Sequence, residues 1–421
     1  MTTTAPRRVG ARTVLTGSAL LSTTMLAVSA ANYALNFVLA RLLDPAEFGD
    51  ASLAITLVLA AAVIAATLQL VASKSVAADP ESLEAVRRTL VRGALVAGAV
   101  AVLVLGGGAW LIADALSVST PWMLVIVSLG LPIYFVQAVH RGALQGQLRF
   151  GRLALSYGVE AAVRVIVVLA LVVAGLGVIG ASVGILLSFV ASAAIARARG
   201  GDRSPRPQGV AWSVVRGAVV AAVVLLLGQT LLNNADLIIA KAVLDAPTAG
   251  VYAAAAVLGR SVFFVSWSVV HVVFPVIASV SSTPEQRRRA FATAVAIIAG
   301  VGGAAVGLAA LAGEPLVRVL FGDAYAAAGA LLVPYLVATS LFALANLLAA
   351  ADLARGNIAA PAVLAVGAVL QTAALALWAR SPEALVWGQV IGTAVIVLAL
   401  GALVVVRWVR TRRASTLDMA L

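Results

Sequence analysis

The side chains best placed for chemistry in this 421-residue sequence are a few charged residues inside long apolar runs. Glu160 and Arg164 lie four residues apart, one turn of a helix, in the favourable order of acid before base. Asp236 and Arg260 lie in successive runs at a similar depth, roughly 12–15 Å from the same end at 1.5 Å per residue. Charges at such depth are costly and usually face a cavity or each other, so all four are candidate binding residues. The alternative for Glu160 and Arg164 is a pair that only neutralises both charges.

Arg260 is the residue that we expect to recognise charge. Arg260, Phe264, Trp267 and His271 are spaced 4, 3 and 4 residues apart, so they share one face of a helix. A guanidinium binds phosphate oxygens in a fork geometry, and aromatic faces such as that of Trp267 suit sugar rings or a prenyl chain. The alternative is that Arg260 forms a structural ion pair with Asp236.

Two polar rows run along the first and seventh apolar runs. Asn32 and Asn36 continue a row of serines at helical spacing, and Gln229, Asn233 and Asp236 form a similar row at matching depth. Facing each other, the two rows would line a water-filled cleft for sugars and phosphate. The alternative is helix packing, which is the commonest role of small and polar residues in membrane helices.

The elements that position these residues are membrane-spanning helices. The sequence is 62% hydrophobic and 11% charged, whereas about a quarter of a soluble protein is charged. We expect an all-α polytopic membrane protein, in which the first run is a permanent span and not a cleaved signal. The absence of Cys excludes disulfides and thiol catalysis. Twelve spans are predicted at about 14–40, 50–72, 93–113, 121–140, 153–174, 177–196, 214–243, 250–278, 291–312, 327–351, 358–379 and 384–406.

The chain repeats itself at an offset of 201 residues. The stretch ARLLDPAEFGDASLA (40–54) returns as KAVLDAPTAGVYAAA (241–255), with Asp44 aligned to Asp245. Its segment DPAE is the start signal of a capped helix, so we interpret it as a tight turn, with a direct role in binding as the alternative. Two parallel six-helix lobes with a central cleft follow from the repeat, at 1–196 and 213–421, joined by a polar cytoplasmic linker at 197–212.

The basic residues assign the two sides of the membrane. Most of the 29 Lys and Arg residues lie in one alternate set of connections, which includes both termini. By the positive-inside rule this set is cytoplasmic. The net charge of +12 therefore reflects topology, and we exclude nucleic acid as a partner. The outer set holds only Arg41, Lys241, Arg318 and Arg380.

Two stretches carry a resemblance to a known family. NYALNFVLARLLDPAEFGDASLA (32–54) resembles the start of the Wzx-type polysaccharide-biosynthesis flippases, of the multidrug/oligosaccharidyl-lipid/polysaccharide exporter superfamily. NNADLIIAKAVLDAPTAGVYAAAAVLGRSVFFVSWSVVHVVFP (233–275) is similar to the second-half signature of that family, with Tyr252 and Phe274-Pro275 in the expected places. The resemblance implies a V-shaped bundle of two lobes that works by alternating access. It also implies an undecaprenyl-pyrophosphate-linked oligosaccharide as cargo, moved across the bacterial cytoplasmic membrane.

Two other classes of function remain as alternatives. A cation-coupled exporter of small amphiphiles would use buried carboxylates, which Glu160 and Asp236 supply. A membrane enzyme such as a glycan polymerase needs a large outer loop, whereas the longest outer connection, around 313–326, has about fourteen residues. The sequence contains no P-loop, paired acidic metal motif or nucleophile elbow, so we expect no enzyme activity, catalytic residue, metal or cofactor. The expected partners are a lipid-linked oligosaccharide and membrane lipids, with glycan-assembly enzymes as further candidates.

We predict that reporter fusions in the 197–209 segment and after Arg413 both report a cytoplasmic location, because the positive-inside rule places both sites with the basic connections. The measurement is the activity of a paired cytoplasmic and periplasmic reporter at each position. A periplasmic signal at either site would show that the number of spans is wrong.

Overall fold

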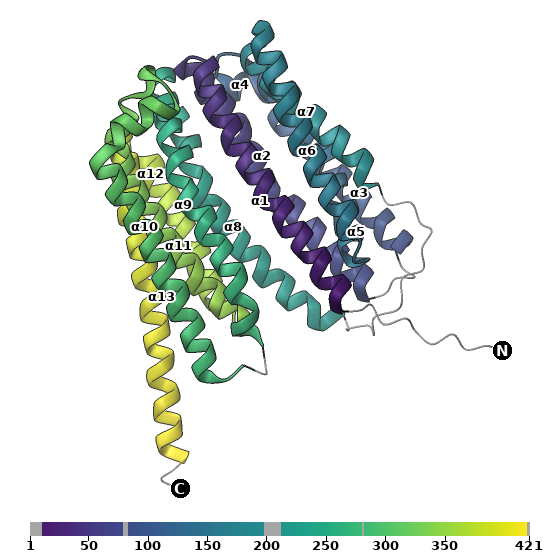
Figure 1. Ribbon diagram of the computed structural model, residues 1–421, viewed down its shortest axis with the longest axis vertical. Coiled ribbons are helices and arrows are strands. Elements are labelled where there is room, and N and C mark those ends of the chain that lie inside the picture. The colour runs from purple at the N-terminus through teal and green to yellow at the C-terminus, as the bar shows by residue number, and fades with distance from the viewer. Residues whose placement is uncertain (1–10, 79–82, 198–211, 280–281, 419–421) are drawn as a thin grey trace, which may run out of the picture. The chain divides into compact units, whose positions relative to one another are not determined.

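A computed structural model describes residues 11–78, 83–197, 212–279 and 282–418, and these ranges are helical apart from short turns. The chain divides into two compact units, Met1–Val219 and Val220–Leu421. The helices of unit 1 are α1 (Ala11–Leu42), α2 (Pro45–Ala78), α3 (Leu83–Ala101), α4 (Ala109–Ala115), α5 (Pro121–Gly146), α6 (Phe150–Leu171) and α7 (Gly177–Ala196) (Figure 1). Those of unit 2 are α8 (Trp212–Val243), which begins just before the boundary, α9 (Ala246–Ala278), α10 (Pro284–Leu320), α11 (Ala328–Ala354), α12 (Ala359–Trp378) and α13 (Pro382–Asp418).

The described residues contain eleven helical stretches that are long and apolar enough to cross a membrane. One of them, Phe150–Ala196, has 47 residues and contains both α6 and α7. Gly175 and Gly177 have positive φ angles of 86° and 45°, and there the chain reverses so that α7 packs along α6. Counting α6 and α7 separately gives twelve spans, so the predicted all-α polytopic fold is confirmed.

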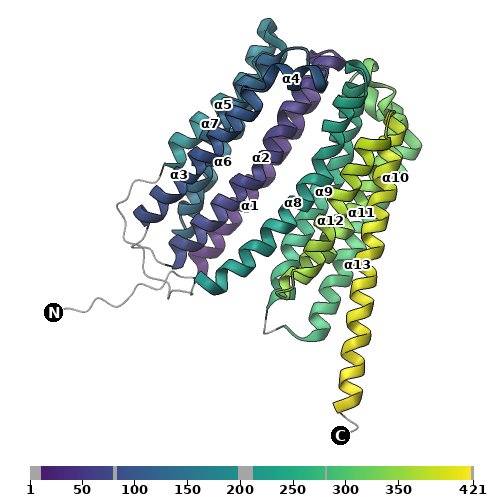
Figure 2. The same cartoon turned by 180° about the vertical axis from the view of Figure 1, so that it is seen from behind.

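The same pattern of helix packing recurs in both units, as the repeat in the sequence predicts. In unit 1, α5 packs against α2, α3, α6 and α7. In unit 2, α11 occupies the equivalent position and packs against α9, α10, α12 and α13, of which the last three lie side by side with α11 in Figure 2. Each unit is therefore built around one central helix. The exact domain limits stay a prediction, because most of the linker at 197–212 lies outside the described residues.

The turns that mark the repeat are capped as predicted. The backbone N–H of Glu47 donates to Asp44 Oδ1 at 2.9 Å, and the N–H of Thr248 donates to Asp245 Oδ2 at 3.2 Å. Each aspartate thus accepts a hydrogen bond from a backbone donor that has no partner within its own helix. The hydroxyl and backbone N–H of Thr248 lower the pKa of Asp245 by stabilising its charged form. The turn is a structural element of the repeat.

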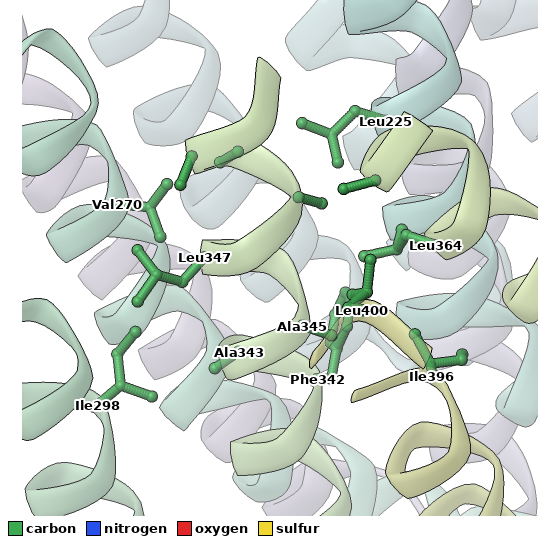
Figure 3. Close-up of a cluster of buried hydrophobic side chains, with 14 of the residues drawn as sticks. Leu225, Val270, Ile298, Phe342, Ala343, Ala345, Leu347, Leu364, Ile396 and Leu400 are labelled. Carbon is green, nitrogen blue, oxygen red and sulfur yellow. The ribbon is translucent and has the colours of Figure 1, made fainter. Parts of the chain in front are cut away.

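The core of unit 2 draws side chains from all six of its helices. Figure 3 shows part of this cluster, to which α11 contributes Phe342, Ala343, Ala345 and Leu347. The other five helices contribute Leu225 from α8, Val270 from α9, Ile298 from α10, Leu364 from α12 and Ile396 and Leu400 from α13. Within lipid, such close packing is the main attraction between helices, because lipid tails are as apolar as leucine.

The contact between α5 and α2 in unit 1 depends on glycine. A Cβ atom on Gly142 would lie 2.3 Å from the carbonyl oxygen of Gln69, and one on Gly146 would lie 2.5 Å from that of Ser73. The two glycines are four residues apart and face the same helix, so they let the two backbones approach closely.

We predict that Gly142→Leu destabilises unit 1 by about 1–3 kcal/mol or more, because the new side chain must displace the backbone of α2. The measurement is the thermal midpoint of the purified protein in detergent. The matched control is Gly300→Leu, since Gly300 is exposed on α10 and a Cβ atom there meets nothing within 4 Å. Equal midpoints for the two variants would contradict the proposed close contact.

Candidate functional site

Unit 1 contains a buried ionic cluster centred on Glu160, which we call the Glu160 cluster and which comprises Gln137, Arg141, Glu160 and Arg164. Glu160 Oε1 accepts from Arg164 Nη2 at 2.6 Å. Its other oxygen, Oε2, accepts from Arg141 Nη2 at 2.8 Å and from Gln137 Nε2 at 2.6 Å. Both oxygens of the carboxylate are therefore satisfied by groups on α5 and α6.

Arg141 is held rigidly between three helices. Its guanidinium donates from Nε to Ser156 Oγ at 3.0 Å and from Nη2 to Ser192 Oγ at 2.8 Å, which ties α5 to α6 and α7. Its Cζ atom lies 3.8 Å from the centroid of the Tyr157 ring. The side chain is only 4% exposed. Arg141 can therefore affect a ligand only indirectly, by orienting the side chains around it.

Arg141 is not among the residues predicted as a site, because the predicted span ends at residue 140 and leaves Arg141 in a cytoplasmic connection. The structure corrects this: α5 continues to Gly146, and Arg141 lies inside it, one turn beyond Gln137. A signal was present, since Gln137, Arg141 and Gln145 recur every four residues and so form a polar row on one face of α5.

Arg164 is the more accessible cation of the Glu160 cluster. Its side chain is 17% exposed, and its Nε has no hydrogen-bond partner among the described residues. Its Nη1 donates to Asn32 Oδ1 on α1 at 3.4 Å. Its Cζ lies 5.6 Å from the centroid of the Phe189 ring, which stacks on Tyr134 with centroids 4.6 Å apart. The arginine thus has a buried, unused donor, Nε, and its guanidinium lies beside an amide and a pair of aromatic rings.

Three residues predicted as a binding site come together here. Asn32, Glu160 and Arg164 lie in one connected network, whereas Asn36 donates from Nδ2 to the backbone oxygen of Asn32 at 2.8 Å and supports it from one turn away. The cluster carries two guanidinium groups and one carboxylate. Counted over the described residues, the cluster therefore has a net charge of one positive unit. A bound anion would neutralise this charge.

Unit 2 contains a second buried cluster, centred on Asp236. Arg260 Nη2 donates to Asp236 Oδ1 at 2.9 Å, so the ion pair that we considered as the alternative for Arg260 is formed. The hydroxyls of Tyr252 and Tyr335 donate to Asp236 Oδ2 at 3.0 and 2.6 Å. Gln389 Nε2 donates to the hydroxyl of Tyr252 at 2.7 Å. These contacts join α8, α9, α11 and α13 in what we call the Asp236 cluster.

The Asp236 cluster is electrically balanced and buried, and Arg260 Nε, like Arg164 Nε, has no hydrogen-bond partner among the described residues. Asp236 is 2% exposed and Arg260 is 9% exposed, and one charge cancels the other. Binding of phosphate by Arg260 stays a prediction, as does binding of a ligand by Trp267, whose side chain lies outside the described part of the structure. Asn233 is half-buried on α8, three residues before Asp236.

The two clusters consist of charged and hydrogen-bonding side chains, and each contains one carboxylate. Among the described residues, no group of three His, Asp or Glu side chains is placed to hold a metal ion.

Comparison with known proteins assigns the chain to a family. A family model described as polysaccharide biosynthesis protein matches residues 38–330, which is more than half of the chain. The matched range includes the whole Glu160 cluster and all of the Asp236 cluster except Tyr335 and Gln389. The chain belongs to this family. The resemblance read from the two signature stretches is therefore confirmed. Comparison with curated protein sequences gives no match.

Solved structures identify the fold as that of transporters of the MOP superfamily. An inward-facing multidrug resistance MATE family transporter matches with a TM-score of 0.76 and 15% identity, over 95% of this chain and 98% of the other. The lipid II flippase MurJ, in an inward closed conformation, matches with a TM-score of 0.71 and 12% identity, over 90% and 86%. A MOP transporter from Pyrococcus furiosus matches with a TM-score of 0.58 and 17% identity, over 96% of each chain.

We predict that Asp236→Asn and Arg260→Gln each destabilise the protein by about 3–5 kcal/mol, because each leaves a buried charge without its partner. The double variant should recover much of that loss. Protein level and thermal midpoint in detergent measure both effects. The opposite pattern would assign a ligand to Arg260: lost transport at a normal protein level in Arg260→Lys, together with a mild effect of Asp236→Asn.

Proposed function

We propose that this membrane transporter translocates a lipid-linked oligosaccharide of the undecaprenyl-pyrophosphate type across the bacterial cytoplasmic membrane by alternating access. The cargo would serve the synthesis of a cell-surface polysaccharide. Membership of the polysaccharide biosynthesis family and the MOP transporter fold support the general class. The net positive charge of the Glu160 cluster supports the specific cargo, because a pyrophosphate is the anion that such a lipid carries.

Arg164 is the residue that we expect to contact the phosphate. Its guanidinium uses Nη2 for Glu160 and Nη1 for Asn32, while Nε remains without a partner among the described residues. A phosphate oxygen would take that donor in a charge-assisted hydrogen bond. Burial strengthens the attraction, since a charge pair away from water is weakly screened.

The neighbours of Arg164 suit the remaining parts of the cargo. The side-chain amide of Asn32 has donors and an acceptor for sugar hydroxyls. Phe189 and Tyr134 offer stacked aromatic faces for a sugar ring or a prenyl chain. Asn32, on α1, and Phe189, on α7, therefore extend the expected contact beyond the phosphate.

The hydrogen-bond and ion-pair partners of the two buried carboxylates argue against the alternative function, a cation-coupled antiporter of small amphiphiles. Such a mechanism needs a carboxylate that loses and regains a proton or a cation during the cycle. Glu160 is held by two guanidinium groups and Asp236 by one guanidinium and two tyrosine hydroxyls. Both oxygens of each carboxylate thus already have donors within the protein, which leaves neither carboxylate open to a transported cation in this arrangement.

The transport cycle that we propose needs no covalent step from the protein. The cargo enters from the inner leaflet, its phosphate pairs with Arg164, and the change of access exposes the same site to the outer leaflet. Consumption of the cargo by glycan-assembly enzymes on the outer side would draw the cycle forward. The expected location is the cytoplasmic membrane with both termini inside the cell.

We predict that cells without the protein accumulate a lipid-linked saccharide in the inner leaflet with its sugar composition unchanged. Labelling of spheroplasts with a glycan-binding probe, before and after permeabilisation, measures the distribution between leaflets. Arg164→Gln should slow transport by about tenfold or more, the effect of one lost charge-assisted hydrogen bond. It should leave the protein level unchanged, because Arg141 and Gln137 still hold Glu160 Oε2 and the amide introduced at position 164 can donate to Oε1.

The matched control is Arg288→Gln, which removes a guanidinium that is 77% exposed on α10. It should transport at the normal rate. Altered sugar linkages in the accumulated material would show an enzyme instead of a transporter. An unchanged distribution between leaflets in cells without the protein would exclude this cargo.

A further inference from the structure

Unit 1 contains a pocket of about 450 Å³ that shares no residue with the Glu160 cluster. It lies where α3 begins and α7 ends, against the last part of α5. We call it the α3–α5–α7 pocket; its lining residues are Glu84, Arg87, Arg88, Val91, Arg92, Val136, His140, Ala193, Ala194 and Arg197.

The α3–α5–α7 pocket is strongly basic. Glu84 is its one acidic residue, and Glu84 already pairs with Arg87 at 2.8 Å and lies 3.8 Å from Arg88. Arg92 and Arg197 have no carboxylate partner within the described ranges. Two guanidinium groups that line the pocket are therefore available, one from α3 and one from the residue that follows α7. Paired guanidinium forks match the oxygens of a phosphate group.

A buried histidine supplies a second and independent sign of a ligand. His140 on α5 lines the pocket, is only 8% exposed, and has a ring nitrogen, Nδ1, without a hydrogen-bond partner among the described residues. Buried polar atoms without partners are rare in proteins and call for an explanation. A ligand oxygen or hydroxyl in the pocket would satisfy this atom.

The apolar lining residues and the location of the pocket favour the phosphate group of a lipid over a free phosphate ion. Val91, Val136, Ala193 and Ala194 form an apolar side, which suits the glycerol and upper acyl chain of a lipid better than a hydrated ion. The basic residues belong to the set of connections that the positive-inside rule places in the cytoplasm, where the membrane leaflet is rich in anionic lipids.

We propose that the α3–α5–α7 pocket binds the phosphate group of an anionic phospholipid of the cytoplasmic leaflet. Arg92 and Arg197 hold the phosphate, His140 hydrogen-bonds the headgroup, and the apolar side receives the start of an acyl chain. The site is separate from the cargo site at Arg164, so it does not depend on the proposed function. A bound lipid would link α3 to α5 and α7 at one end of unit 1.

Native mass spectrometry of the full-length protein in detergent, titrated with dioleoyl phosphatidylglycerol, tests this proposal. We expect one phosphatidylglycerol to bind more tightly than dioleoyl phosphatidylcholine. The double variant Arg92→Gln/Arg197→Gln should weaken that binding by about twenty-five-fold, because each basic residue near an anionic lipid contributes roughly a factor of five. Both arginines are exposed, so the thermal midpoint should not change.

The matched control is Arg288→Gln/Arg289→Gln, which removes two guanidinium groups that are 77% and 78% exposed on α10. These residues are the repeat equivalents of Arg87 and Arg88, and their loss should leave phosphatidylglycerol binding unchanged. An equal loss in both double variants would show a general effect of surface charge and overturn the proposal. Displacement of the lipid by inorganic phosphate at a similar concentration would assign the pocket to a soluble anion and overturn the lipid assignment.

Discussion

Compensation of charge inside the hydrocarbon layer governs how this protein is assembled. Hydrocarbon cannot solvate a carboxylate, so each buried one must find its partners on neighbouring helices. Glu160 does so through Arg141, Arg164 and Gln137, and Asp236 does so through Arg260 and two tyrosines. Because these partners lie on different helices, the correct packing of each unit is also the arrangement that satisfies its charges. Helices that slipped by one turn would leave a charge exposed to lipid.

The two units have the same arrangement of helices but buried clusters of different net charge. Both place a central helix, α5 or α11, against four others. In unit 1 the central helix contributes a cation, Arg141. The Glu160 cluster therefore contains two guanidinium groups and one carboxylate, a net charge of one positive unit. In unit 2 the central helix contributes a neutral hydroxyl, that of Tyr335, and the cluster is balanced. The two units thus share a fold but differ in charge, and the proposed function assigns the anion of the cargo to the cluster of unit 1.

Much of this architecture was predictable from the sequence, because membrane spans, a repeat and helix caps are local signals. The turns at Asp44 and Asp245 followed from a few adjacent residues, and the approach of Asp236 and Arg260 followed from counting depth along two helices. Arg141 was missed because hydropathy cannot distinguish an arginine in a loop from one in the last turns of a helix. Tyr335 and Gln389 were missed because each meets the Asp236 cluster from about a hundred residues away or more, and the sequence alone does not give that contact.

The links between α1 and α2 and between α8 and α9 have a consequence for how the protein can be cut. Each link is only two residues long, Leu43–Asp44 and Leu244–Asp245, and each aspartate is fixed by a hydrogen bond to the next helix. Proteases attack extended, exposed loop tips, and these links offer none. Limited digestion of the folded protein will therefore leave α1 joined to α2 and α8 joined to α9, as helical hairpins that survive together.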